Sequence, residues 1–142
     1  MDKLSVLREA HRLGGQARSD RMNKVAVFAR QNQCVVASTG GRGGTMQVRY
    51  GSLNLPVLDM TVEGVVTIFI RPSTNAEVAT ELTRVLTEAL AEVEDLRVTI
   101  APRRASGKLT DLLEDVPEDA LTEWVTRSVN AIRENIYENP NI

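Results

Sequence analysis

The chain has 142 residues, 42% hydrophobic and 25% charged, with a formal net charge of −2 at pH 7. This composition is typical of one folded domain, and no apolar run approaches the roughly 20 residues of a membrane-spanning helix, so we expect no membrane partner. Cys34 and His11 are the only cysteine and histidine, which excludes intrachain disulfides, cysteine-cluster zinc sites and any His-rich metal site, and leaves many enzyme mechanisms without their usual general base. The N-terminus lacks the basic-then-apolar layout of a secretory signal, so a cytoplasmic location is expected.

The charges are unevenly distributed along the chain. Residues 1–50 contain nine Lys and Arg against three acids, so the remainder carries a net charge of −8. A chain of this kind can present a cationic surface to a polyanion. Alternatively, the basic and acidic halves attract each other within the fold. The sequence leaves both interpretations open.

The N-terminal third mixes helical and strand patterns. An apolar periodicity predicts a helix over residues 2–13 that ends at Gly14-Gly15. The polar segment after it is a second helical turn, an arm or a loop. Residues 24–30 and 33–38 have the composition of strands, although a helix over 25–33 competes for the first of them.

The middle of the chain predicts an antiparallel meander. Residues 45–50 alternate between apolar and polar side chains, which is typical of a half-buried strand. A further extended segment starts at Leu55, and Glu63-Gly64 forms a turn. The β-branched run at 65–70 then predicts a buried strand.

Helices are expected to dominate the rest of the chain. Thr74 and Glu77 have capping-box spacing, and an apolar stripe predicts a helix over 75–94 that packs across the sheet. Residues 97–100 are expected to be extended, residues 109–113 to form a short helical piece, and Val116-Pro117 to open a last helix that contains Trp124.

The predicted fold is therefore a single α+β domain. It combines an antiparallel sheet of about four to six strands with a long amphipathic helix on it, an N-terminal helix and C-terminal helices. Its parts are an N-terminal helix or arm (1–23), the sheet with the long helix (24–104) and a C-terminal helical extension (105–142). One sheet and one helix face cannot bury all the apolar surface of the chain. We therefore expect a homodimer in which helix 75–94 and the Trp124 helix pack against the partner.

Two basic, glycine-containing loops are candidates for anion binding. Arg42 lies within Gly40–Gly44, where glycine backbone can approach a phosphate, but no phosphate-loop pattern surrounds it and a hairpin connection explains it equally. The turn at 103–108 adds three possible phosphate contacts, Arg103, Arg104 and Lys108. No spacing of carboxylates suggests a catalytic pair or a metal cage, so we expect no enzyme activity, no metal and no cofactor.

The polar face of the predicted meander is the most informative feature. Thr45, Gln47 and Arg49 occupy alternate positions and project from the same side of their strand. With Arg30 on a neighbouring strand, they would form a cationic, hydrogen-bonding surface suited to RNA. A solvent-exposed sheet face that binds no ligand is the simpler alternative.

Several short matches, in order along residues 25–104, resemble the coat proteins of small single-stranded RNA bacteriophages. The matching segments are Ala29-Arg30-Gln31-Asn32, Thr45 to Tyr50, Leu55-Pro56, Val66-Thr67-Ile68 followed by Ser73-Thr74, and Val93-Glu94-Asp95-Leu96 followed by Val98 to Pro102. The chain departs from the family in its N-terminal helix and in residues 105–142.

The resemblance implies a self-assembling structural protein. Its subunits would pair as homodimers whose sheets join edge to edge, and the dimers would close into a viral shell, the virion, assembled in the host cytoplasm. The inward sheet face would bind an RNA stem-loop, with RNA-binding positions at Arg30, Thr45, Gln47, Arg49 and Thr61. The alternative is a nucleic-acid-binding or adaptor homodimer, chaperone-like and cytoplasmic, that forms no shell.

Overall fold

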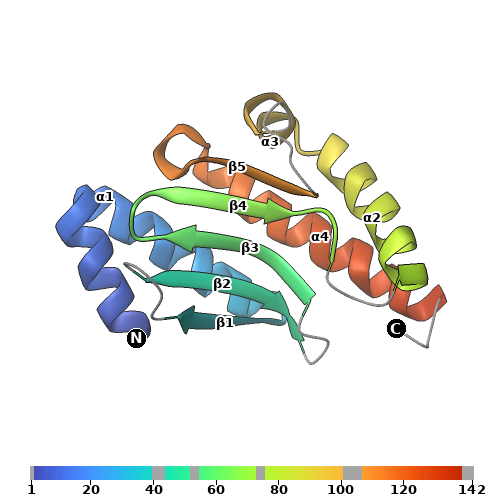
Figure 1. Cartoon of the computed structure of the whole chain (residues 1–142), viewed down its shortest axis with the longest axis horizontal. Coiled ribbons are helices and arrows are strands. Elements are labelled where there is room, and N and C mark those ends of the chain that lie inside the picture. Colours follow the sequence, from blue (N-terminus) through green and yellow to red (C-terminus); the bar gives the residue numbers. More distant parts are fainter. Residues whose placement is uncertain (1, 40–43, 52–54, 73–75, 101–106, 139–142) are drawn as a thin grey trace.

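The computed structural model describes residues 2–39, 44–51, 55–72, 76–100 and 107–138, without the side chains of 76–79 and 136–138. A single five-stranded antiparallel sheet runs in the order β1 (Cys34–Thr39), β2 (Thr45–Tyr50), β3 (Leu55–Thr61), β4 (Val65–Phe69) and β5 (Lys108–Leu112). Helices α1 (Lys3–Gln31) and α4 (Glu118–Glu138) pass behind it (Figure 1). The predicted α+β class with an antiparallel meander is confirmed.

One face of the sheet forms the core and the other carries no helix among the described residues. Alternate side chains of the central strands point toward α1 and α4 and are fully buried; they are Met46, Val48, Leu58, Met60, Val66 and Ile68. The Trp124 side chain of α4 lies in the same core, and its Nε1 donates to the Val57 carbonyl oxygen at 3.1 Å. The opposite face of the sheet carries the strand side chains that alternate with these buried ones, and we call it the open face.

Helix α1 is longer than the sequence predicts. Asp2 accepts a hydrogen bond from the Ser5 N–H at 2.8 Å and begins the helix, and Gly15 bends it with φ 81° and ψ −177° instead of ending it. The expected strand at 24–30 is wrong, and the competing helix is correct. The buried residues of the second half, Met22, Val25, Ala26 and Ala29, are spaced by three and four, so the helical stripe decides the conformation.

Helix α2 (Ala76–Ala91) lies beside the sheet and not across it. It packs mainly against α4, as Figure 1 shows. Its apolar residues Leu82, Leu86 and Leu90 are buried in the core of the single chain. Within one chain, α2 and α4 therefore already cover much of this stripe and of the Trp124 stripe, and the expected packing of both against a partner stays a prediction. The predicted cap at Thr74 lies outside the described residues.

Two segments after α2 also differ from expectation. The segment expected to be extended at 97–100 belongs to α3 (Glu94–Thr99), because Val93, Leu96 and Ile100 are buried at helical spacing while Val98 is 67% exposed. The expected helical piece at 109–113 is strand β5, which alternates between buried and exposed side chains and is followed by a single 3-10 turn, η3 (Leu113–Asp115). The chain therefore returns to the sheet through β5 before α4, which begins near Pro117 as predicted.

Candidate nucleic-acid interface

The open face brings together four of the five predicted RNA-binding residues. Thr45 pairs with Thr61 across β2 and β3, and Gln47 pairs with Asp59 in the same register. Arg49 follows on the same side of β2. These four side chains and that of Asp59 are half-buried, because neighbouring strands flank them while no described helix covers them. The face is thus a shallow surface of hydroxyl, amide and guanidinium groups.

These polar groups also contact one another. The Arg49 Nε donates to the Gln47 Oε1, which fixes the direction of the guanidinium group. Burial raises the pKa of Asp59, while a hydrogen bond from Gln47 and the charges of Arg49 and Lys108 oppose this shift. The Thr61 Oγ1 accepts a hydrogen bond from the Val65 N–H at 3.1 Å and so supports the turn between β3 and β4. The network fixes side chains on a rigid sheet, as a binding surface requires.

Strand β5 adds a second cation to this face. Lys108 pairs in register with Phe69, and its Nζ lies 5.6 Å from the centre of that ring. Thr110 lies on the same side of β5 and pairs with Thr67 of β4. Lys108 was predicted only as part of a basic turn, and Asp59, Thr67 and Thr110 were missed. Strand alternation in 55–61 and 65–69 already contained the signal for Asp59 and Thr67, whereas Thr110 was missed because 109–113 was expected to be helical.

Arg30 does not belong to the open face. It lies in the last turn of α1 and is exposed, because residues 24–30 are helical. The pKa of Lys3, at the opposite end of the same bent helix, is lowered mainly by burial and to a smaller extent by the positive charge of Arg30. The prediction that Arg30 sits on a strand beside Thr45 is therefore wrong. Arg42, Arg103 and Arg104 lie outside the described residues.

Three cations of the N-terminal third contact the acidic C-terminal part. The Arg18 side chain, 15% exposed, passes over Gly14 and Gly64 and donates to the Val62 carbonyl oxygen at 2.8 Å and the Glu114 carboxylate at 2.5 Å. Arg21 donates to the carbonyl oxygens of Leu113 and Val116, and Lys24 pairs with Glu118. Attraction between the basic and acidic halves is confirmed for Arg18 and Lys24, which form ion pairs, whereas Arg21 bonds only to backbone carbonyl oxygens.

The described part of the chain offers little else that could support metal binding, thiol chemistry or membrane insertion. Its residues contain no group of three or more His, Cys, Asp or Glu placed to hold a metal ion. Cys34 is buried, which raises the pKa of its thiol to about 11 and keeps it protonated at neutral pH. No helix among the described residues has the length and apolarity needed to cross a membrane.

Comparison with known proteins found no matching family model, no matching curated protein and no matching solved structure.

Proposed function

We propose that the chain is a non-catalytic RNA-binding protein that receives RNA on the open face of its sheet. The observation that supports this most is the convergence of Thr45, Gln47, Arg49 and Thr61 on the face that no described helix covers. Hydroxyl and amide groups suit the 2′-hydroxyl and phosphate oxygens of RNA, and a guanidinium group pairs with phosphate. The location that we propose is the cytoplasm.

The charge of the open face suits a polyanion only moderately. Among the residues that the structure describes there, Arg49 and Lys108 are its cations and Asp59 is its anion. Burial raises the pKa of the Asp59 carboxyl, while the charges of Arg49 and Lys108 oppose this shift. Binding on this face therefore relies on hydrogen bonds from the threonines and Gln47 together with two phosphate contacts.

Self-association through β5 is part of the proposal. β5 is an edge strand of the described sheet, and its Leu112 side chain is exposed. An unpaired edge strand can pair with the same strand of a second copy across a two-fold axis. Such pairing would join two open faces into one wider surface for RNA.

The proposed RNA-binding protein has two possible forms, a homodimer without a shell and a coat subunit that assembles into one. Helical residues 24–30, the return of β5 to the sheet and the burial of the α2 and α4 stripes within one chain all depart from the coat-protein pattern. These differences favour the RNA-binding homodimer without a shell. The coat subunit is the second candidate. The short sequence matches, which occur in the same order as in the coat proteins, and the same four open-face residues support it.

Size-exclusion chromatography of the recombinant protein tests both forms. The absorbance ratio of each peak reports nucleic acid, and negative-stain microscopy reports particles. A dimer that elutes with RNA, and loses it when Arg49 and Lys108 are both changed to Gln, supports the homodimer. Uniform closed particles containing RNA support the coat subunit instead, and a protein that neither copurifies with RNA nor binds added RNA overturns the proposal.

A further inference from the structure

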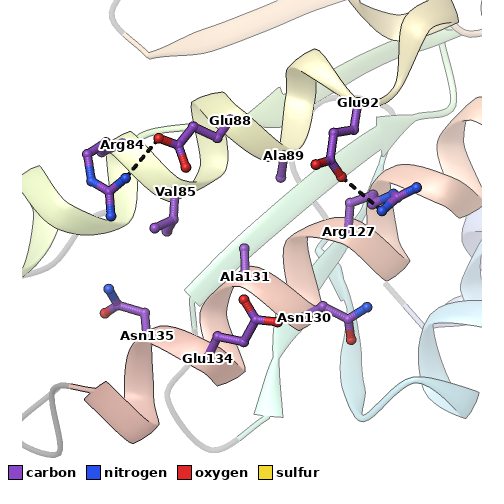
Figure 2. A pocket seen from close by; sticks show the side chains of 10 residues that line it. All are labelled: Arg84, Val85, Glu88, Ala89, Glu92, Arg127, Asn130, Ala131, Glu134 and Asn135. Atoms are coloured by element: carbon purple, nitrogen blue, oxygen red, sulfur yellow. Dashed lines mark hydrogen bonds and ion pairs between the residues drawn. The ribbon is translucent and has the colours of Figure 1, made fainter.

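A groove lies between α2 and α4, away from the open face of the sheet. Its volume is about 450 Å³, and Figure 2 shows side chains of both helices around it. Small residues form its floor: Ala89 on α2 faces Ala131 on α4, with Val85 one turn away from Ala89. Charged residues of both helices form its rim. The groove therefore has an apolar floor between polar walls, so it offers both an apolar contact and polar contacts to a ligand.

Asn135 is the unusual residue of this groove. Its side chain is 2% exposed and points from α4 toward α2 (Figure 2), yet neither its Oδ1 nor its Nδ2 has a hydrogen-bond partner among the described residues. Ser128, two turns earlier and equally buried, donates to the Val125 carbonyl oxygen at 3.2 Å. Because buried polar groups in folded proteins are nearly always bonded, Asn135 offers an unpaired acceptor atom, Oδ1, and an unpaired donor group, Nδ2, to a ligand.

The rim of the groove has a free negative charge. Arg84 pairs with Glu88 and Arg127 pairs with Glu92, each at 2.8 Å, so both guanidinium groups already have carboxylate partners. Glu134 has no ion pair among the described residues, and Figure 2 shows its carboxylate at the groove. The groove lining as a whole has three carboxylates and two guanidinium groups. A ligand with a positive charge is therefore favoured over an anion.

We propose that this groove binds an extended peptide segment of a partner protein that carries a lysine or arginine. The carboxamide of Asn135 matches a peptide group, since its Oδ1 can accept from the peptide N–H and its Nδ2 can donate to the peptide carbonyl oxygen. The floor formed by Val85, Ala89 and Ala131 takes the methylene stem of the basic side chain, and Glu134 pairs with its charged end. The site is independent of RNA on the open face.

The test is an NMR titration of the full chain with blocked single residues. The probes are the N-acetyl, N′-methylamide forms of lysine, norleucine and glutamate, which share the two peptide groups and differ in the side chain. We expect saturable shifts of the Asn135 side-chain amide and of the Ala89 and Ala131 backbone amides with the lysine probe. Norleucine should bind about two- to fivefold more weakly, because it lacks an exposed ion pair.

Variants of the groove separate its two contacts. Glu134→Gln removes an exposed carboxylate and should reduce lysine binding to the level of norleucine, while Glu63→Gln, the same change in the distant turn between β3 and β4, should have no effect. Asn135→Leu should weaken all probes by about tenfold and raise the melting temperature, because it removes an unpaired buried amide.

Three results would overturn the proposal. The first is the absence of saturable shifts at the groove, as expected if Asn135 bonds only water. The second is equal affinity for the lysine and glutamate probes. The third is a Glu134→Gln variant that binds lysine as tightly as the unchanged protein.

Discussion

The two faces of the sheet are built by the same strands and have opposite properties. Met46 and Val48 of β2 are fully buried against the helices, whereas Thr45, Gln47 and Arg49, which alternate with them, remain half-exposed on the open face. On the covered face the side chains contribute stability through burial, and on the open face they are available for contacts with a ligand. A shift of the strand by one residue would exchange the faces, so the register that stabilises the core also presents the candidate site.

The largest expected contrast between the faces is in stability. Met46→Ala should lower the free energy of unfolding by about 2–5 kcal/mol, because it leaves a cavity in the core. The adjacent change Gln47→Ala should alter it by no more than about 0.5 kcal/mol. Urea unfolding of both variants checks this. Similar losses for the two variants would show that the open face is packed against something that this account leaves out.

Arg18 should behave like a core residue although it is charged. Arg18→Gln should lower the free energy of unfolding by about 1–3 kcal/mol, because the Val62 carbonyl oxygen and Glu114 lose their donor. RNA affinity, measured by fluorescence anisotropy with a short single-stranded RNA, should not change. A clear loss of RNA affinity in a variant that remains folded would instead place the N-terminal segment in the RNA-binding site.

The sequence alone predicts part of this fold and of the candidate site. The strand 45–50 was predicted with its bounds and its faces, because strict alternation is a strong local signal. The segments 24–30, 97–100 and 109–113 were assigned the wrong conformation, since their short apolar patterns fit both periods and tertiary packing decides between them. Arg30 was lost from the site for this reason, and the groove at Asn135 depends on the contact of two helices that no local pattern reveals.

Arg49 and Arg30 should differ in their effect on RNA binding. Arg49→Gln should lower the affinity and reduce the slope of log affinity against log salt by about 0.7, the value for one lost phosphate contact to a single strand. Arg30→Gln, at the end of α1, should leave both unchanged. Anisotropy titrations at several salt concentrations provide the comparison. The account would be wrong about the face if the two variants responded in the opposite order.

Asp59 should have the smallest effect, and one of opposite sign. Its pKa is raised above its usual value of 3.8, so the folded state binds a proton more readily than the unfolded state. The contribution of Asp59 to stability therefore grows as the pH falls from neutral through the raised pKa, and it is lost as the pH rises. RNA affinity should increase over the same range, because a negative charge disappears from the open face.

Asp59→Asn separates this effect from other acid-induced changes. The variant should bind RNA more tightly than the unchanged protein at neutral pH, and the difference should shrink as the pH falls. Anisotropy at a series of pH values, with Glu63→Gln as the matched control in the exposed turn, measures both. A variant that binds more weakly than the unchanged protein would mean that the carboxylate itself contacts the ligand.

The central claim is that RNA lies on the open face, and an NMR map of backbone amide shifts on addition of a short single-stranded RNA tests it most directly. We predict that the largest shifts fall on Thr45, Gln47 and Arg49 of β2 and on the facing residues Asp59 and Thr61 of β3. Smaller shifts should follow on Thr67 and Lys108, with α2 and α3 unchanged. Shifts confined to α1 or to the groove between α2 and α4, or none at all, would contradict the account.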